Sequence, residues 1–194
     1  MMNPRIKEMI AQSIATKEAV LADERLLTTV QEVVNICIIT FKNGGKVLFC
    51  GNGGSAADAQ HLAAELSGRF YFDREPLFAE ALHVNSSFVT AVANDYNYEE
   101  VYARMIRAAG RKGDVLFAMS TSGNSENIIR AIKDAKKIKM IVIGMTGESG
   151  GKMRDLCDFL INIPSHDTPR IQECHMMLGH LICELIENEL FKIK

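Results

Sequence analysis

The sequence predicts an α/β protein, a three-layer αβα sandwich with a five-stranded parallel sheet, preceded by N-terminal helices. Five short apolar runs are nearly continuous rather than alternating, as in strands that are buried on both faces. Helical stretches separate these runs, and strands that alternate with helices form right-handed βαβ units. The length of 194 residues fits one compact domain. We expect residues 1–45 to supply N-terminal helices for oligomer packing and residues 46–194 to form the α/β core and C-terminal helix.

Two helices are expected before the first strand, over about residues 6–21 and 26–42. In the second, apolar side chains recur three and four residues apart, as on one face of a helix. The sequence Asn43-Gly44-Gly45 ends it, because glycine readily takes the left-handed conformation used beyond a helix end.

Strands and helices then alternate. The apolar runs predict strands at residues 47–50, 79–84, 115–119, 141–145 and 159–163. Helices are expected between them at about residues 56–66, 99–109, 126–137 and 152–156. The last helix, at about 170–191, is apolar on more than one face, so several neighbours must cover it. We therefore expect this helix and the 26–42 helix to pack against other subunits of a homo-oligomer.

Composition excludes some classes of partner. A formal charge of -2 disfavours nucleic acid, whose binding proteins usually carry a basic face. No apolar segment approaches the roughly 20 residues of a membrane span. The N-terminus has no basic stretch followed by an apolar run, so we expect no signal peptide. The five cysteines form no C-x-x-C pair and lie in apolar stretches, which is typical of buried, reduced thiols. These features predict a cytoplasmic protein.

Polar loops follow the first and third strands, at the edge where open α/β sheets bind ligands. The first, Gly51-Asn52-Gly53-Gly54-Ser55, matches neither a dinucleotide fingerprint nor a phosphate-binding P-loop. A ligand loop and a tight turn capped by Ser55 explain it equally well. The second, Ser120-Thr121-Ser122-Gly123-Asn124-Ser125, has more hydroxyls than a cap needs, which favours an anion at the helix start. Asn94 and Asp95 could bind sugar hydroxyls, although Asn-Asp is also a common turn signal.

Two helices carry side chains suited to proton transfer or metal binding. His61 and Glu65 are four residues apart and share a helix face. Gln172 and His180 point roughly alike on the last helix. Either pair alone is more often a solvated pair than a site. If the helices meet, the four residues offer two imidazoles, a carboxylate and an amide oxygen, donors that suit zinc or another divalent metal.

Together these motifs are similar to those of the sugar isomerase (SIS) domain family, and within it to the phosphoheptose isomerases. The similarity covers almost the whole chain. It rests on residues 50–61 and 64–69, Asn94-Asp95-Tyr96, the loop 120–125, Arg170-Ile171-Gln172-Glu173 and His180. The resemblance implies a flavodoxin-like sandwich assembled as a homotetramer. It also implies conversion of sedoheptulose 7-phosphate to D-glycero-D-manno-heptose 7-phosphate, the first step of ADP-heptose synthesis for surface glycans such as lipopolysaccharide.

The resemblance also assigns roles to residues. Glu65 would be the base and His180 its acid–base partner, with one zinc ion per subunit at His61, Glu65, Gln172 and His180. The substrate would contact Asn52, Gly53, Gly54, Ser55, Glu65, Asn94, Asp95, Ser120, Thr121, Ser122, Ser125 and Gln172. Pro169 replaces a polar residue found in some family members, so Asp167 or Thr168 is expected to substitute for it.

Two other functions fit parts of the pattern. A related non-enzymatic SIS protein binds the bacterial replication initiator, but it lacks counterparts of Glu65 and His180. An isomerase of another phosphosugar would share the loops, because nothing in them measures sugar length. The catalytic pair favours an enzyme.

Overall fold

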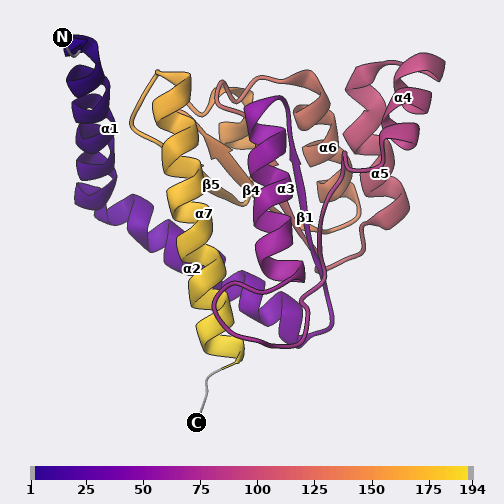
Figure 1. Cartoon of the computed structure of the whole chain (residues 1–194). Coiled ribbons are helices and arrows are strands. Elements are labelled where there is room, and N and C mark those ends of the chain that lie inside the picture. Colours follow the sequence, from indigo (N-terminus) through magenta and orange to yellow (C-terminus); the bar gives the residue numbers. More distant parts are fainter. Residues whose placement is uncertain (1–2, 192–194) are drawn as a thin grey trace.

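The computed structural model describes residues 3–191 and contains a five-stranded, all-parallel sheet (Figure 1). Its order is β2-β1-β3-β4-β5. The strands are β1 (Val47–Gly51), β2 (Ala79–Ala81), β3 (Val115–Met119), β4 (Ile141–Thr146) and β5 (Phe159–Asn162). Because the strands are parallel, all their carboxyl ends meet at one edge, as the sequence predicted.

Helices cover both faces of the sheet. On one face lie α2 (Glu24–Lys42), α3 (Gly54–Ser67) and α7 (Thr168–Leu190), and on the other α4 (Ser86–Asp95), α5 (Val101–Ala109) and α6 (Glu126–Lys137). Alternate strand residues point to the two layers, so Phe49 and Phe117 stack beneath the first layer while Leu48 and Leu116 face the second. The three-layer sandwich is therefore confirmed.

Three local predictions need correction. The second strand ends at Ala81 rather than at residue 84. Helix α4 was not predicted; the Asn85 side chain accepts the backbone N–H of Phe88 and starts it. A short 3₁₀ helix, Gly151–Asp155, takes the place of the α-helix expected at 152–156. A second short 3₁₀ helix, Tyr98–Glu100, precedes α5.

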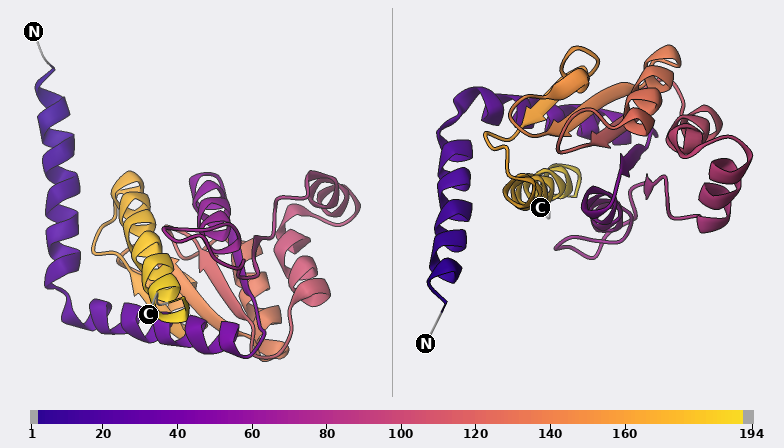
Figure 2. Two further views of the ribbon diagram at one scale, coloured as in Figure 1. Left: turned by 60° about the horizontal axis from the view of Figure 1, so that its bottom comes forward. Right: turned by 90° about the horizontal axis from the view of Figure 1, so that it is seen from above.

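Helix α1 (Pro4–Ala22) projects away from the body of the subunit, at a steep angle to α2 (Figure 2). The Asp23 side chain caps the start of α2 by accepting the N–H of Leu26. At the far side, Arg170 of α7 donates to the carbonyl of Met9. Four apolar side chains of α1 are about half exposed: Ile6, Met9, Ile10 and Ile14.

The apolar face of α2 is covered within its own subunit. Val33 and Cys37 are completely buried, and they belong to the same core as the α7 residues Leu178 and Ile182. The sheet and α7 thus cover this face within the subunit, and packing of α2 and α7 against other subunits stays a prediction. None of the helices between residues 3 and 191 has both the length and the apolar character needed to cross a membrane.

Candidate active site

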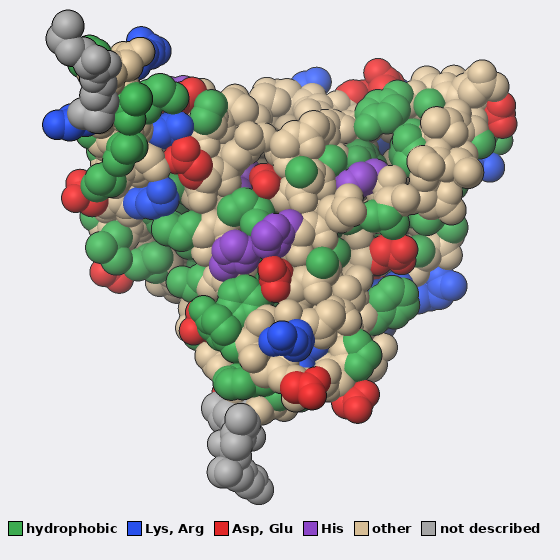
Figure 3. All heavy atoms as spheres, in the orientation of Figure 1, with side chains coloured by type: hydrophobic (Ala, Val, Ile, Leu, Met, Phe, Trp, Pro, Cys, Tyr) green, Lys and Arg blue, Asp and Glu red, His purple; other side chains and the backbone are tan. Residues whose placement is uncertain are grey.

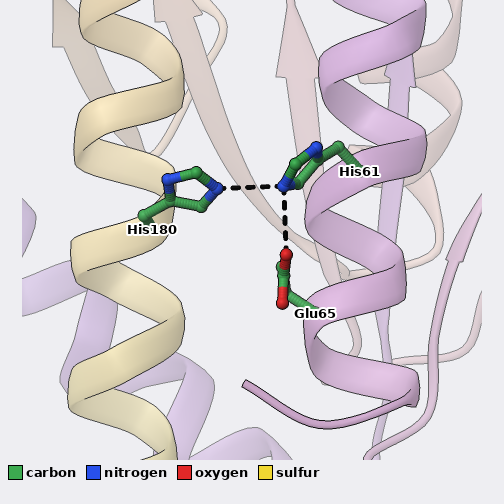
Figure 4. Close-up of side chains that lie close together, drawn as sticks. All are labelled: His61, Glu65 and His180. Carbon is green, nitrogen blue, oxygen red and sulfur yellow. Dashed lines mark hydrogen bonds and ion pairs between the residues drawn. The ribbon is translucent and has the colours of Figure 1, made fainter. Parts of the chain in front are cut away.

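Three side chains from α3 and α7 converge on one face of the molecule (Figure 4). The Nε2 atom of His61 lies 3.0 Å from Oε1 of Glu65 and 3.0 Å from Nε2 of His180. The side chain of His61 is about half exposed, at 49%, whereas that of Glu65 is 25% exposed. Figure 3 shows histidine side chains gathered at the surface of this face, and the exposure of His61 lets a ligand reach it.

The meeting of the two helices depends on a close contact at Gly179, next to His180. A Cβ atom on Gly179 would lie 2.6 Å from both methyl carbons of Leu62, the neighbour of His61. Glycine therefore lets α7 approach α3 closely enough for the two imidazoles to touch. Leu62 is the side chain of α3 that fills the space beside His180.

Gln172, the fourth ligand that the resemblance implies, lies on α7 beside the glycine loop. Its amide lies against Gly54, where a Cβ atom would be 2.5 Å from its Nε2 atom. Gly54 precedes His61 by seven residues, or about 10 Å of helix. Gln172 as a fourth metal ligand stays a prediction. Its position beside the glycine loop suits contact with substrate.

The three donors fit a divalent metal such as zinc. Their ligand atoms all lie within 4.8 Å of one another. In a tetrahedral zinc site with bonds of 2.0–2.1 Å, neighbouring ligand atoms are about 3.3 Å apart, close to the two 3.0 Å separations here. Two imidazoles and one carboxylate also form a common donor set of catalytic zinc sites, which leaves a coordination position for substrate.

Asp58 lies one turn before His61, and its Oδ2 atom is buried without a hydrogen-bond partner among residues 3–191. Burial raises the pKa of Asp58, although the nearby His61 opposes this shift. The phenyl ring of Phe70 covers the other side, with its centroid 5.8 Å from that of His180. Sequence reasoning missed Phe70, since nothing in the spacing places residue 70 against the last helix.

The glycine loop turns sharply into α3. Gly53 has φ of +55° and occupies the N-cap position, so only glycine takes this conformation easily. Ser55 is therefore not the cap; it lies inside the helix and is only 4% exposed. Gly53 and Gly54, in contrast, are exposed at the edge of the sheet where a ligand can contact their backbone.

The hydroxyl loop has the features of an anion site. The Oγ atoms of Ser120 and Ser125 are 3.1 Å apart, and those of Ser120 and Ser122 are 3.4 Å apart. Ser125 is the N-cap residue of α6, yet its side chain makes no capping hydrogen bond. The hydroxyl of Ser125 thus remains available at a helix N-terminus, where free N–H groups and the helix dipole favour a phosphate.

A pair of amides joins the two loops. Asn52 donates to Oδ1 of Asn127 at 2.9 Å, and Asn127 donates back to Oδ1 of Asn52 at 2.8 Å. The hydroxyl of Tyr98 also donates to Asn52, at 3.4 Å, and that of Tyr102 donates to the carbonyl of Gly51. The sequence predicted Asn52 but not Asn127, whose only signal is its position in the first turn after the hydroxyl loop.

The remaining candidates occupy different surroundings. Asn94 and Asp95 end α4 instead of forming a loop, and the Asn94 amide donates to Asp95 at 2.9 Å. Thr168 lines a hollow of about 270 Å³ together with Thr121 and Ser122, a position that suits the role predicted for it in place of residue 169. Asp167 lies at the N-cap position of α7 and is largely exposed.

Comparison with known proteins adds a further finding. A model of the SIS domain family matches residues 8–147. A phosphoheptose isomerase of Aneurinibacillus thermoaerophilus is 50% identical over 193 residues, spanning 100% of this chain and 98% of that protein. One of Mycobacterium tuberculosis is 52% identical over 185 residues, spanning 95% and 94%.

Solved structures agree. A phosphoheptose isomerase of Neisseria gonorrhoeae superposes with a TM-score of 0.89 at 42% identity, and one of Francisella tularensis with 0.91 at 34% identity. Each match covers 95% of this chain and 97% of the other. These similarities extend through α7, which the SIS domain model does not reach.

Proposed function

The chain belongs to the SIS domain family and, within it, to the phosphoheptose isomerases, and we propose that it converts sedoheptulose 7-phosphate into D-glycero-D-manno-heptose 7-phosphate. The observation that carries this proposal is the contact of His61 and Glu65 with His180 across two helices. A protein that only binds a phosphosugar, or that binds the replication initiator, has no use for this group.

Isomerisation moves one proton from C1 to C2 of the open-chain sugar. We assign Glu65 as the base that takes the C1 proton while the C2 carbonyl oxygen is protonated, which gives an enediol. The O1 hydroxyl then loses its proton, and Glu65 returns a proton to C2, leaving an aldehyde at C1. We assign His180 to give a proton to O2 and later to take one from O1. Oε1 of Glu65 faces His61, so Oε2 is assigned the proton transfer.

The phosphate anchors the far end of the sugar. The hydroxyls of Ser120, Ser122 and Ser125, together with Thr121 and the start of α6, supply hydrogen bonds to it. Binding energy from this unreacting group helps to fix the reacting carbons beside Glu65. We assign the chain between them to the glycine loop (Asn52, Gly53, Gly54, Ser55), Asn94, Asp95 and Gln172.

Zinc is the metal that we propose for the cluster, with His61, Glu65 and His180 as three of its ligands and Gln172 as the fourth. When bound, it would polarise the substrate oxygens and stabilise the enediolate. Oε1 of Glu65 would hold the metal, which leaves Oε2 of the same carboxylate for the proton transfer.

We further propose that the protein works in the cytoplasm as a homotetramer and supplies ADP-heptose synthesis for surface glycans such as lipopolysaccharide. The exposed apolar side chains of α1 and of α7, among them Ile10, Leu181 and Leu185, support association. Its five cysteines carry no disulfide and are buried or half-buried, which suits a reducing compartment.

The decisive test incubates the pure protein with sedoheptulose 7-phosphate and follows the aldose by NMR, with added zinc and after chelation. We expect conversion with zinc and little without it. Parallel reactions with a pentose and a hexose phosphate determine the preferred chain length. No conversion in any arm would contradict the proposal, and binding to purified replication initiator would then favour the non-enzymatic alternative.

A further inference from the structure

An irregular segment, residues 68–78, connects α3 to β2 and passes beneath the active site. Such a segment must find partners for its backbone groups. Two charged side chains provide them: Arg74, within the segment, and Glu187, on α7. Their side chains are only 2% and 1% exposed, and Nε of Arg74 lies 2.7 Å from Oε1 of Glu187.

Both oxygens of Glu187 are fully used. Oε1 accepts the backbone N–H of Phe70 at 2.9 Å in addition to Arg74. Oε2 accepts the N–H groups of Tyr71 at 2.6 Å and Phe72 at 3.1 Å. Burial works against ionisation of Glu187, but these hydrogen bonds outweigh it and lower its pKa. One carboxylate thus fixes three successive residues of the segment onto α7.

The guanidinium of Arg74 caps the end of α3. It donates at 3.0 Å to the carbonyls of Glu65 and Leu66, and it also reaches those of Gly68 and Glu75. The last carbonyls of a helix lack partners and carry partial negative charge, so a cation is favourable there. Helix α3 has no basic residue in its own last turn, and Arg74 fills that place.

This ion pair is connected to both helices that carry the active-site residues, α3 and α7. Glu65, whose carbonyl Arg74 holds, is one of the three clustered residues. Glu187 follows His180 by seven residues, two turns along the same face of α7. Phe70, held by Glu187, packs its ring against His180. Arg74 thus contacts the backbone of Glu65 directly, and Glu187 contacts His180 through Phe70.

We propose that Arg74 and Glu187 are positioning residues that set the separation of α3 and α7 and so hold Glu65 and His180 at metal-binding and catalytic distance. This inference rests on the proposed function for its chemistry, but zinc binding tests it separately. Residues that support metal ligands typically change affinity by 10–100-fold when they are lost.

The chain offers a matched control in a buried carboxylate whose hydrogen bonds come from outside α3 and α7. Asp114 is also a buried carboxylate, 3% exposed, that pairs with a cation, Lys46, at 2.5 Å. It likewise accepts backbone N–H groups, from Lys46 and Arg111. Asp114→Asn and Glu187→Gln thus make the same chemical change, the first at a carboxylate paired with Lys46 and Arg111 and the second at the carboxylate that holds the segment onto α7.

The experiment compares wild type, Glu187→Gln and Asp114→Asn for zinc affinity, by competition with a chromophoric chelator, and for kcat and KM. We expect Glu187→Gln to weaken zinc binding at least about 10-fold and to lower kcat, with KM nearly unchanged because the phosphate loop is untouched. Asp114→Asn should reduce Tm but leave zinc affinity and kcat within about twofold. Equal zinc affinity and kcat in the two variants would overturn the inference.

A milder pair of variants applies if Glu187→Gln does not fold. Arg74→Lys keeps the charge opposite Glu187 but cannot reach four carbonyls at once, and Lys46→Arg is its control. We expect weaker zinc binding and lower kcat only for Arg74→Lys; wild-type values in it would refute positioning. If wild type binds zinc yet isomerises nothing, the proposed function fails while the zinc comparison still decides this inference.

Discussion

Glu65 is asked to serve both as a zinc ligand and as the base that attacks C1. Its Oε1 atom already faces His61 at 3.0 Å, so the two roles divide between the two oxygens of one carboxylate. Such a division is possible because a quarter of the Glu65 side chain is exposed. The Glu65 backbone carbonyl, in turn, accepts a hydrogen bond from Arg74.

Replacing Glu65 by Gln removes the base while keeping the shape of the side chain. We expect kcat to fall by about 10² to 10⁴, the usual contribution of general base catalysis, with a smaller change in KM. Steady-state kinetics with sedoheptulose 7-phosphate measures both. Glu80→Gln, on the exposed position of β2, is the control and should behave as wild type. Wild-type turnover in Glu65→Gln would rule out this base.

His175 illustrates a histidine that takes no part in the site. It is completely buried, and its Nε2 atom lies 3.2 Å from the carbonyl of Thr146. Burial lowers its pKa to about 4, although the bond to Thr146 opposes the shift. The neutral imidazole is therefore the form that the folded protein accommodates.

This shift predicts a loss of stability in mild acid. Below the unfolded pKa of about 6.5, the unfolded chain binds a proton that folded His175 refuses, so the free energy of unfolding decreases as pH falls from about 6.5 to 4. The loss amounts to about 3 kcal/mol for a shift of this size. Urea unfolding at a series of pH values measures it. His175→Gln should flatten this part of the curve; an unchanged slope would contradict the assignment.

Single residues differ in how far the sequence reveals them. The spacing of His61 and Glu65 was visible, because residues four apart share a helix face. Their meeting with His180 was not, since it depends on the contact between Gly179 and Leu62. The same holds for Arg74 and Glu187, whose partners are set by tertiary packing rather than by a local pattern.

At the scale of elements, the start of α6 is the phosphate site that we propose. Ser125 caps the helix by position without using its hydroxyl for the cap, so helix stability depends little on that side chain. A hydrogen bond to a charged group is worth about 1.5–3 kcal/mol.

Ser125→Ala should accordingly raise KM for the phosphosugar about 10- to 100-fold, with a smaller effect on kcat and on Tm. Inhibition by inorganic phosphate should weaken in parallel. Ser87→Ala, in the exposed first turn of α4, provides the comparison and should change neither constant. A fall in kcat with KM unchanged would place the phosphate elsewhere.

Strands were easier to predict than the helix α4. The strands of a buried parallel sheet read as continuous apolar runs, and the bounds of β3 agree with those expected. Helix α4 contains Val89, Thr90 and Val92, whose branched side chains lower helix propensity. Its end at Asn94 and Asp95 also resembles a turn. Packing of Val92 into the core decides in favour of the helix.

For the whole molecule, α1 is the element that one subunit leaves uncovered. Its apolar strip lies on an arm that projects from the body (Figure 2). Ile10→Glu places a charge in this strip and should shift the protein to smaller species and reduce its Tm. Light scattering coupled to size-exclusion chromatography measures the mass. Phe78→Glu, at an exposed apolar side chain before β2, should keep the wild-type mass. A wild-type mass for Ile10→Glu would exclude this strip from the interface.

The strand order also governs when the molecule can form. In the sheet, β1 lies between β2 and β3, and Val47 pairs with Val115, far along the chain. During synthesis β1 can therefore be paired on both sides only after β3 has been made. Pairing between strands so far apart in the sequence slows folding. The active site forms later still, because His180 and Glu187 lie on α7, the last of the helices that cover the sheet. A nascent chain that has completed its sheet still lacks half of its catalytic group, so activity begins only when this helix has docked.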